Sequence, residues 1–307
     1  MDIDKIIKIF KRAMARYGMY FTVWLFKVLP YGAVRYITGI LVSIGFRFTI
    51  KQRRIAKESL TIAFGKEKTQ EEIEQIIRNC FANLGRGMVE MIYFFSHPEK
   101  VMEKVSFQGR RHLDDALAKG HGVIAVTAHF GNFPLMMLAC VRAGYKTSAI
   151  IRPTRDKEME KFLFNMRTKM GLNTVYALPR HTCVSSSLRI LRNNEILFVP
   201  LDQNFGRGGG VFVDFFGYKA ATATGPVVLA MRTNAVILPM FIIRENRDRH
   251  KIIIEPPFEL EYIKDEKEMV HINIARITKL IEQYIRRYPH EWGWMHRRWK
   301  TRPEINV

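Results

Sequence analysis

Short apolar runs alternate with longer amphipathic segments through most of the chain. Each run has the length and the continuous apolar character of a buried strand, and the runs are Gly122–Ala128, Thr147–Ile151, Ile196–Leu201 and Ala235–Ile243. The segments beside them have helical spacing, and they are Pro134–Arg142, Lys157–Met170, Val184–Asn193 and Thr224–Thr233. Continuous apolar strands separated by helices are typical of an α/β protein, so we expect a largely parallel central sheet flanked by helices.

Two long helices are predicted outside this alternation. Thr69 is followed by acidic residues and then by the apolar Ile73 and Ile77, which is the pattern of a helix that begins after a Thr cap. This helix is expected to continue to about Phe95. Lys267–Arg287 has apolar residues at helical spacing, so it is predicted to be a long amphipathic helix.

The chain begins with a basic, aromatic-rich segment. Residues 1–60 contain 12 Lys or Arg against 3 Asp or Glu, and their longest uncharged run is 11 residues, Tyr36–Phe46. A helix that spans a membrane needs about 18–20 consecutive apolar residues, so we expect helices that associate with a membrane surface and do not cross it. The alternative is that these helices pack on the remaining domain, 61–307, and expose a solvated basic face.

Net charge and cysteine content narrow the possible partners. The formal charge is +20, which favours an anionic partner such as lipid head groups, nucleic acid or an acidic protein. Three isolated cysteines and no helical zinc motif predict neither a disulfide framework nor a metal site. A second basic segment, 286–302, contains Trp292, Trp294 and Trp299, a composition that suits either nucleic acid or a membrane interface.

Polar residues follow three of the predicted strands. His129, Arg152 and Asp202 come directly after them, and ligands of parallel sheets bind beyond the carboxyl ends of the strands. A His with a pKa near 6.5 is suited to removing a proton from a hydroxyl. The alternative for His129 is a structural hydrogen bond to a loop carbonyl, and for Arg152 it is an ion pair with a residue such as Asp156.

Four blocks of sequence resemble a known family. The run from His129 to Pro134 (HFGNFP) is similar to the His-x4-acid box of the glycerolipid acyltransferase superfamily. This run and the residues that lead into it, Gly109–Ala128, form the first block. Together with Ile151-Arg-Pro, Asp202–Pro226 and Trp294–Pro303, it resembles the lipid A biosynthesis (lauroyl/myristoyl) acyltransferase family over nearly the whole chain. A motif of four ordered blocks is far more specific than a single His.

The resemblance implies a reaction and its participants. An acyl thioester, usually on acyl carrier protein or else on coenzyme A, would donate a fatty acyl chain to a hydroxyl of a lipid A precursor, an anionic glycolipid. The reaction would occur at the cytoplasmic face of the inner membrane, with no further cofactor and no nucleic acid. His129 would accept the hydroxyl proton, with Asp202 as a further catalytic residue. Arg152, or amide groups after Gly131, would stabilise the oxygen that becomes negative.

Substrate contacts are expected around the same motif blocks. A Gly-rich loop at Gly206–Gly210 lacks the Lys-Ser/Thr of a nucleotide-binding P-loop, so Arg207 is interpreted through the resemblance as a contact to a substrate phosphate or to the carrier. Thr224 and Gly225 begin a predicted helix whose free amides could bind an anion, although such residues also serve as simple caps. The full set of expected substrate contacts is Gly131, Asn132, Gln203, Arg207, Thr224 and Gly225.

One position departs from the family pattern. The family has an acidic residue where this chain has Pro134, and that carboxylate would hold the His129 ring. Either another carboxylate, Asp202 or Glu90, orients the ring, or a backbone carbonyl does so. The third possibility is a non-catalytic basic protein on an acyltransferase-like fold that binds lipid or nucleic acid.

Overall fold

The central element of the structure is a seven-stranded sheet. The computed structural model describes residues 3–206, 208–246 and 248–303. The strands, in spatial order, are β1 (Val105–Gln108), β9 (His250–Ile254), β8 (Val236–Arg244), β2 (Val123–Thr127), β5 (Ile196–Pro200), β3 (Thr147–Ile151) and β4 (Leu172–Tyr176). All neighbouring strands are parallel except β8 and β9, which are antiparallel. The predicted α/β class with a largely parallel sheet is confirmed.

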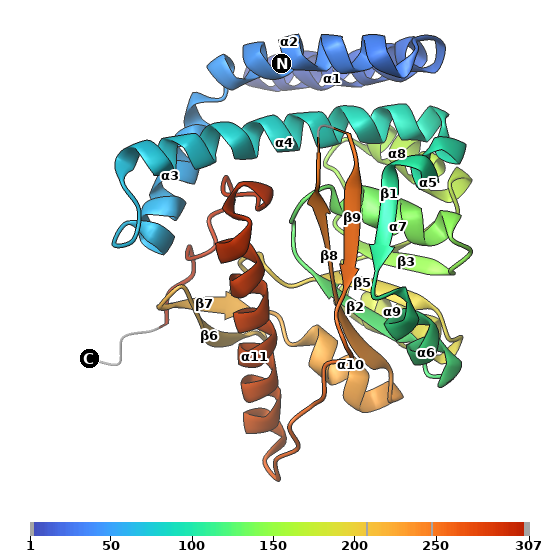
Figure 1. The fold of residues 1–307 in the computed structure, drawn as a ribbon, viewed down its shortest axis with the longest axis vertical. Coiled ribbons are helices and arrows are strands. Elements are labelled where there is room, and N and C mark those ends of the chain that lie inside the picture. Colours follow the sequence, from blue (N-terminus) through green and yellow to red (C-terminus); the bar gives the residue numbers. More distant parts are fainter. Residues whose placement is uncertain (1–2, 207, 247, 304–307) are drawn as a thin grey trace.

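Helices cover both faces of this sheet (Figure 1). Those that follow the amino-terminal arm are α4 (Gln70–Ser96), α5 (Val101–Lys104), α6 (Arg110–Ala118), α7 (Phe133–Arg142), α8 (Lys157–Lys169), α9 (Arg180–Arg192), α10 (Gly225–Thr233) and α11 (Glu266–Arg287). Two short 3-10 turns, Pro98–Lys100 and Pro289–Glu291, and a small antiparallel hairpin, β6 (Val211–Phe215) with β7 (Tyr218–Thr222), complete the body.

Side chains of the central strands alternate between two hydrophobic clusters. Ile124 and Val126 of β2 belong to the cluster that includes residues of α9, α10 and α11. Val123 and Ala125 belong to the other cluster, which includes residues of α6 and α7. Successive strand residues point to opposite faces, so a strand covered on both sides is apolar throughout. This explains why these strands appear as continuous apolar runs in the sequence.

The long helix α4 begins as predicted. Thr69 forms a capping box, in which the Glu72 amide donates to the Thr69 hydroxyl and the Thr69 amide donates to the Glu72 carboxylate. Other boundaries were less predictable. Helix α9 begins at Arg180, four residues before the predicted start, and the strands β1, β4 and β9 are additional to those predicted.

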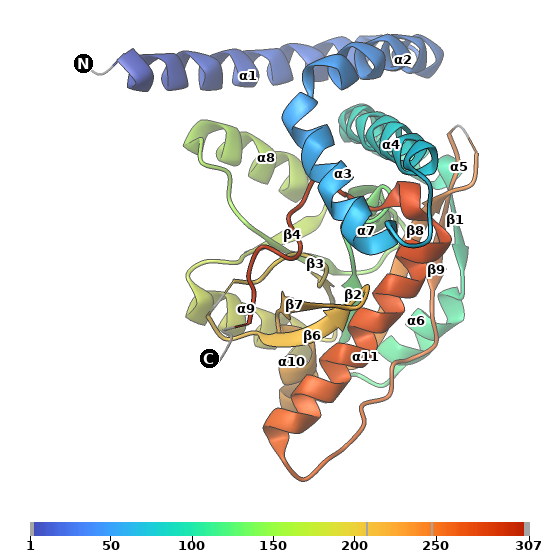
Figure 2. The ribbon, with the colours of Figure 1, turned by 90° about the vertical axis from the view of Figure 1, so that its left-hand side faces the viewer.

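The amino-terminal arm consists of α1 (Ile3–Val28), α2 (Tyr31–Phe48) and α3 (Ile50–Phe64). Helices α1 and α2 form a layer at one end of the molecule (Figure 2), and α3 descends from it into the main core, where Leu60 and Phe64 are buried. Among the described residues, no single helix has the length and apolar character needed to cross a membrane. Helices α2 and α3 meet that criterion together but are bent by 80°.

The arm exposes many large apolar side chains beside basic ones. On α1 and α2 the exposed large apolar side chains recur at helical spacing, and they are Phe10, Met14, Tyr17, Phe21, Trp24, Val28, Tyr36, Ile40, Leu41, Ile44 and Phe48. The inner face of α2 packs on α4 through the buried Val34 and Thr38. The arm therefore packs on the domain, and the surface that it leaves exposed carries large apolar side chains as well as basic residues such as Arg12 and Lys27.

The tryptophans of the carboxyl-terminal basic segment lie inside the protein, whereas Arg297, Lys300 and Arg302 are exposed. Trp292, Trp294 and Trp299 are 0%, 0% and 4% exposed, and the Arg298 side chain is fully buried. The Arg298 guanidinium donates hydrogen bonds to the Ala221 carbonyl at 2.6 Å and to the Thr222 hydroxyl at 2.5 Å. The three rings and Arg298 therefore hold the β6–β7 hairpin against the core and are not part of an exposed surface for nucleic acid or membrane.

A buried ionic cluster joins α4 to the sheet. The Glu90 carboxylate accepts hydrogen bonds from both terminal nitrogens of Arg244, at 2.6 and 2.9 Å, and lies 3.0 Å from His250 Nε2. The Asn132 amide donates to the same carboxylate at 3.0 Å. Burial raises the pKa of Glu90, but the hydrogen bonds and charges of His250 and Arg244 outweigh it and lower that pKa to about 2.

We expect Glu90→Gln to lower the free energy of unfolding at pH 7 by about 3–5 kcal/mol, because it removes a buried carboxylate charge that Arg244 and His250 contact. The lowered pKa means that Glu90 stabilises the fold above pH 4.5 and that this contribution is lost as the pH falls toward 2. Denaturant unfolding at several pH values measures both effects. The control is Glu74→Gln, on the same helix α4 as Glu90, which breaks an exposed ion pair with Lys57 of α3. It should change the free energy of unfolding by less than about 1 kcal/mol. Equal stability of the two variants would contradict this assignment.

Candidate active site

His129 is held at the end of β2 by a tight turn. Gly131 has a φ of +58°, and a Cβ there would lie 2.0 Å from the Ile242 carbonyl oxygen, so the turn requires glycine. The Gly131 amide donates to the Glu291 carbonyl at 2.8 Å, and the Gly293 amide donates to the His129 carbonyl at 3.2 Å. Hydrogen bonds to the carboxyl-terminal segment therefore fix the backbone on both sides of the His129 ring.

Asp202 orients the His129 ring. The two residues follow the neighbouring strands β2 and β5, and His129 Nδ1 lies 2.8 Å from Asp202 Oδ1. The other carboxylate oxygen, Oδ2, accepts a hydrogen bond from Trp292 Nε1 at 2.7 Å. Because the carboxylate is only 2% exposed and remains charged, it stabilises the tautomer with a proton on Nδ1. Nε2 is left as the acceptor, and it has no hydrogen-bond partner among the described residues.

The two groups shift each other's pKa values in opposite directions. Burial lowers the pKa of His129, but the charge and the hydrogen bond of Asp202 outweigh burial, so the pKa lies above its ordinary value of 6.5. For Asp202, burial raises the pKa, but the charge and hydrogen bond of His129 and the hydrogen bond from the Trp292 N–H outweigh burial and lower that pKa. His129 is therefore a stronger base than a free imidazole while Asp202 stays ionised.

A cavity of about 310 Å³ lies beside this pair. Its walls combine apolar side chains with a few polar groups, and they comprise Cys80, Asn83, Leu84, His129, Gly131, Phe133, Gln203, Glu291, Trp292, Gly293, Met295 and His296. No group of three or more His, Cys, Asp or Glu that could hold a metal ion is found within the described parts of the chain. A partly apolar cavity beside an oriented base is suited to proton transfer from a bound hydroxyl.

Of the predicted substrate contacts, Gly131 and Gln203 line this cavity. Asn132 is buried, and its side chain accepts from the Leu135 amide at 3.3 Å and donates to Glu90, so it caps α7 and links it to α4. Thr224 and Gly225 begin α10 outside the cavity lining, and the Thr224 side chain does not cap the helix. Arg207 lies outside the described residues.

Arg152 is exposed at the end of β3. Strand β5 lies between β3 and β2, so the ends of β3 and β2 are separated by two strand spacings, about 10 Å. Arg152 is not part of the cavity lining. Its predicted partner Asp156 instead pairs with Arg16 of α1 at 3.4 Å, and this ion pair ties the arm to the segment before α8.

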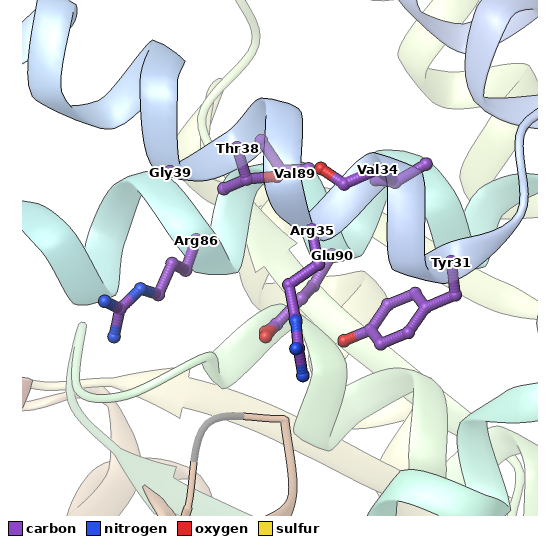
Figure 3. Close-up of a pocket in the computed structure, with 8 residues that line it drawn as sticks. All are labelled: Tyr31, Val34, Arg35, Thr38, Gly39, Arg86, Val89 and Glu90. Atoms are coloured by element: carbon purple, nitrogen blue, oxygen red, sulfur yellow. Dashed lines mark hydrogen bonds between the residues drawn. The ribbon is translucent and has the colours of Figure 1, made fainter.

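Glu90, the other carboxylate considered for orienting His129, does not do so. It contributes to a separate cavity of about 270 Å³ between α2 and α4, where Tyr31 and Arg35 come from α2 and Arg86 comes from α4 (Figure 3). Its carboxylate bonds to Arg244 and His250 as described above. Asp202 alone of the two candidates replaces the missing acid at Pro134, and Pro134 occupies the first turn of α7, where a missing N–H is tolerated.

Two residues of the site were not predicted. Trp292 supports the Asp202 carboxylate, and His296 lines the cavity and accepts a hydrogen bond from the Asn204 amide at 2.8 Å. Both belong to the aromatic and basic segment that composition alone suggested was a surface. The available signal was the block Trp294–Pro303, which carries part of the family resemblance.

Comparison with known proteins identifies the family. The sequence profile described as bacterial lipid A biosynthesis acyltransferase matches residues 6–301. The chain therefore belongs to this family, and the predictions of an acyltransferase and of lipid A biosynthesis are confirmed at that level.

Two similar proteins are named as lipid A biosynthesis acyltransferases. The chain is 27% identical over 286 residues to a lipid A biosynthesis palmitoleoyltransferase of Escherichia coli K12, covering 91% of this chain and 89% of the relative. It is 26% identical to the lauroyltransferase of the same organism, with 92% and 90% covered. A solved 1-acyl-sn-glycerophosphate acyltransferase of Thermotoga maritima is similar at 13% identity with a TM-score of 0.38, covering 80% of this chain and 97% of that one.

We expect an NMR titration to give His129 a pKa above 6.5, and Asp202→Asn to lower it below 6.5. Without the carboxylate charge, burial dominates and disfavours the charged imidazole. Asp248→Asn serves as the control, because that carboxylate pairs with Lys104 and not with a residue of the site. A His129 pKa that is the same in the wild type and in Asp202→Asn would contradict the pairing.

Proposed function

We propose that the protein transfers a fatty acyl chain from an acyl thioester to a hydroxyl of a lipid A precursor, with His129 as the general base. The observation that carries this proposal is the His129–Asp202 pair, in which Nδ1 is bonded at 2.8 Å and Nε2 has no partner in the described chain. It supports catalysis over the non-catalytic alternative because an oriented, more basic imidazole beside a cavity is what proton removal requires.

The reaction needs three events at this site. His129 Nε2 accepts the proton of the acceptor hydroxyl as that oxygen attacks the thioester carbon. The resulting imidazolium is stabilised by Asp202, whose buried charge is held in place by the Trp292 N–H. When the tetrahedral intermediate collapses and the C–S bond breaks, the imidazolium returns the proton to the leaving thiolate. No cofactor is required beyond the acyl donor.

The substrates are proposed from charge and from the relatives. The net charge of +20 favours anionic partners, which suits both an acidic acyl carrier protein and the phosphates of coenzyme A. We favour the carrier protein as donor. The acceptor is proposed to be a lipid A precursor because the relatives include a lipid A palmitoleoyltransferase and a lipid A lauroyltransferase.

The arm is proposed to place the site at the membrane. Its exposed apolar stripe would enter the acyl boundary of the cytoplasmic face of the inner membrane, while basic residues of the same helices, such as Arg12, Lys27 and Arg47, would meet anionic head groups. Contact through this stripe would bring a lipid acceptor to the enzyme without a spanning helix.

We expect His129→Ala to reduce acyl transfer by about 10²- to 10⁴-fold, because general base catalysis typically contributes that much. The assay supplies purified protein with labelled acyl carrier protein and a panel of hydroxylated lipid acceptors that includes a lipid A precursor. His181→Ala, an exposed His on α9, is the matched control and should remain active. Retained turnover in the His129 variant would rule out the base, and no labelled acceptor with the wild type would favour the non-catalytic alternative.

We expect the double variant Phe21→Ser and Trp24→Ser to bind vesicles of anionic phospholipid at least about tenfold more weakly. Burial of a large apolar side chain contributes about 1.5–3 kcal/mol, and both residues are exposed on α1. Sedimentation with vesicles at low and high salt measures this, and wild-type binding should partly survive high salt. Tyr262→Ser, at a still more exposed aromatic residue outside the arm, is the control. Unchanged partitioning of the double variant would contradict the proposed docking face.

A further inference from the structure

Several N–H groups around the His129 cavity already have acceptors. The Gly131 amide donates to Glu291 and the Gly293 amide donates to His129, so neither can stabilise a substrate oxygen. Trp292 Nε1 is bonded to Asp202. Arg152, the predicted stabiliser, is outside the lining. The oxygen that becomes negative during acyl transfer therefore needs a donor other than these four groups.

His296 has such a donor. Its Nε2 accepts a hydrogen bond from the Asn204 backbone amide at 2.8 Å, and an amide N–H can only donate. The ring proton must therefore be on Nδ1. Among the described residues Nδ1 has no hydrogen-bond partner, and it is not one of the enclosed, unsatisfied polar atoms. The ring lines the same cavity as His129, so its N–H remains available to a bound molecule.

The surroundings keep this imidazole neutral and in place. Burial lowers the pKa of His296. The charge of Asp202 opposes that shift, whereas the charges of His129 and Arg298 add to it. The backbone on either side is also held, because the His296 amide donates to the Gly293 carbonyl and the Ser59 hydroxyl donates to the His296 carbonyl. A neutral ring with one fixed donor costs little reorganisation when charge develops on a substrate oxygen.

We propose that His296 Nδ1–H is the oxyanion donor of the reaction, an inference that rests on the proposed function. As the acceptor oxygen bonds to the thioester carbon and its proton passes to His129 Nε2, the carbonyl π pair moves onto the carbonyl oxygen. The His296 N–H donates a hydrogen bond to that oxygen. The pair then re-forms the C=O bond, the C–S bond breaks, and the thiolate takes the proton from His129.

Two substitutions separate the two nitrogens of this ring. In His296→Gln the amide group reaches the position of Nε2 and can still accept from Asn204, but the donor at Nδ1 is lost. In His296→Asn the shorter amide reaches the position of Nδ1 and can still donate into the cavity, but the acceptor for Asn204 is lost. We would measure steady-state kinetics and thermal unfolding for both variants, the wild type and His129→Ala. Each kcat is normalised to the folded fraction, which circular dichroism gives at the assay temperature.

An oxyanion donor predicts that His296→Gln keeps a near wild-type Tm and KM but loses about 10²- to 10³-fold in kcat. It also predicts that His296→Asn is less stable yet retains the higher kcat of the two. A purely structural role predicts the reverse order, and near wild-type kcat in His296→Gln would overturn the inference. If the wild type transfers the acyl chain and His129→Ala does not, near wild-type kcat in His296→Gln overturns only the role of His296 and leaves the proposed function standing. Absence of transfer by the wild type overturns the proposed function and this inference together.

Discussion

The hydrogen bond between a buried carboxylate and an imidazole is the interaction on which the candidate active site depends. Asp202 is almost fully enclosed, and both of its oxygens are used, one by His129 and one by Trp292. A buried charge is costly unless it is paired, so the site depends on both partners being present. The same enclosure strengthens the effect of the carboxylate on the ring, which makes His129 more basic despite its own burial. The missing acid at Pro134 is thereby replaced from another strand.

The carboxyl-terminal segment builds much of this site from the inside. Trp292 holds the carboxylate, Gly293 fixes the His129 backbone, and His296 faces the cavity. Farther along, Arg298 and Trp299 bond to the β6–β7 hairpin. The aromatic rings and Arg298, which suggest a binding surface in the sequence, therefore help to seal the core behind the candidate active site. The apolar face that remains exposed is at the opposite end of the chain, on α1 and α2.

The sequence predicted features that depend on local pattern. Buried parallel strands are apolar on both faces, which made β2 and β5 recognisable, and the parallel arrangement placed His129 and Asp202 at one edge. Features that depend on packing across the chain were missed. Asn132 and Glu90 had the right chemistry for the site, but tertiary contacts join them to each other and away from His129. The position of Arg152 depends on strand order, because β5 separates its strand from β2, and residue spacing in the chain does not give that order.

The most direct test of the His129–Asp202 pair is the pH dependence of kcat/KM for acyl transfer. His129 must be neutral to accept a proton, so activity should fall with decreasing pH through a pKa above 6.5. In Asp202→Asn the acidic limb should move to lower pH and the plateau should fall. An acidic limb at the same pH in both proteins would contradict the claim that this carboxylate sets the basicity of the catalytic imidazole.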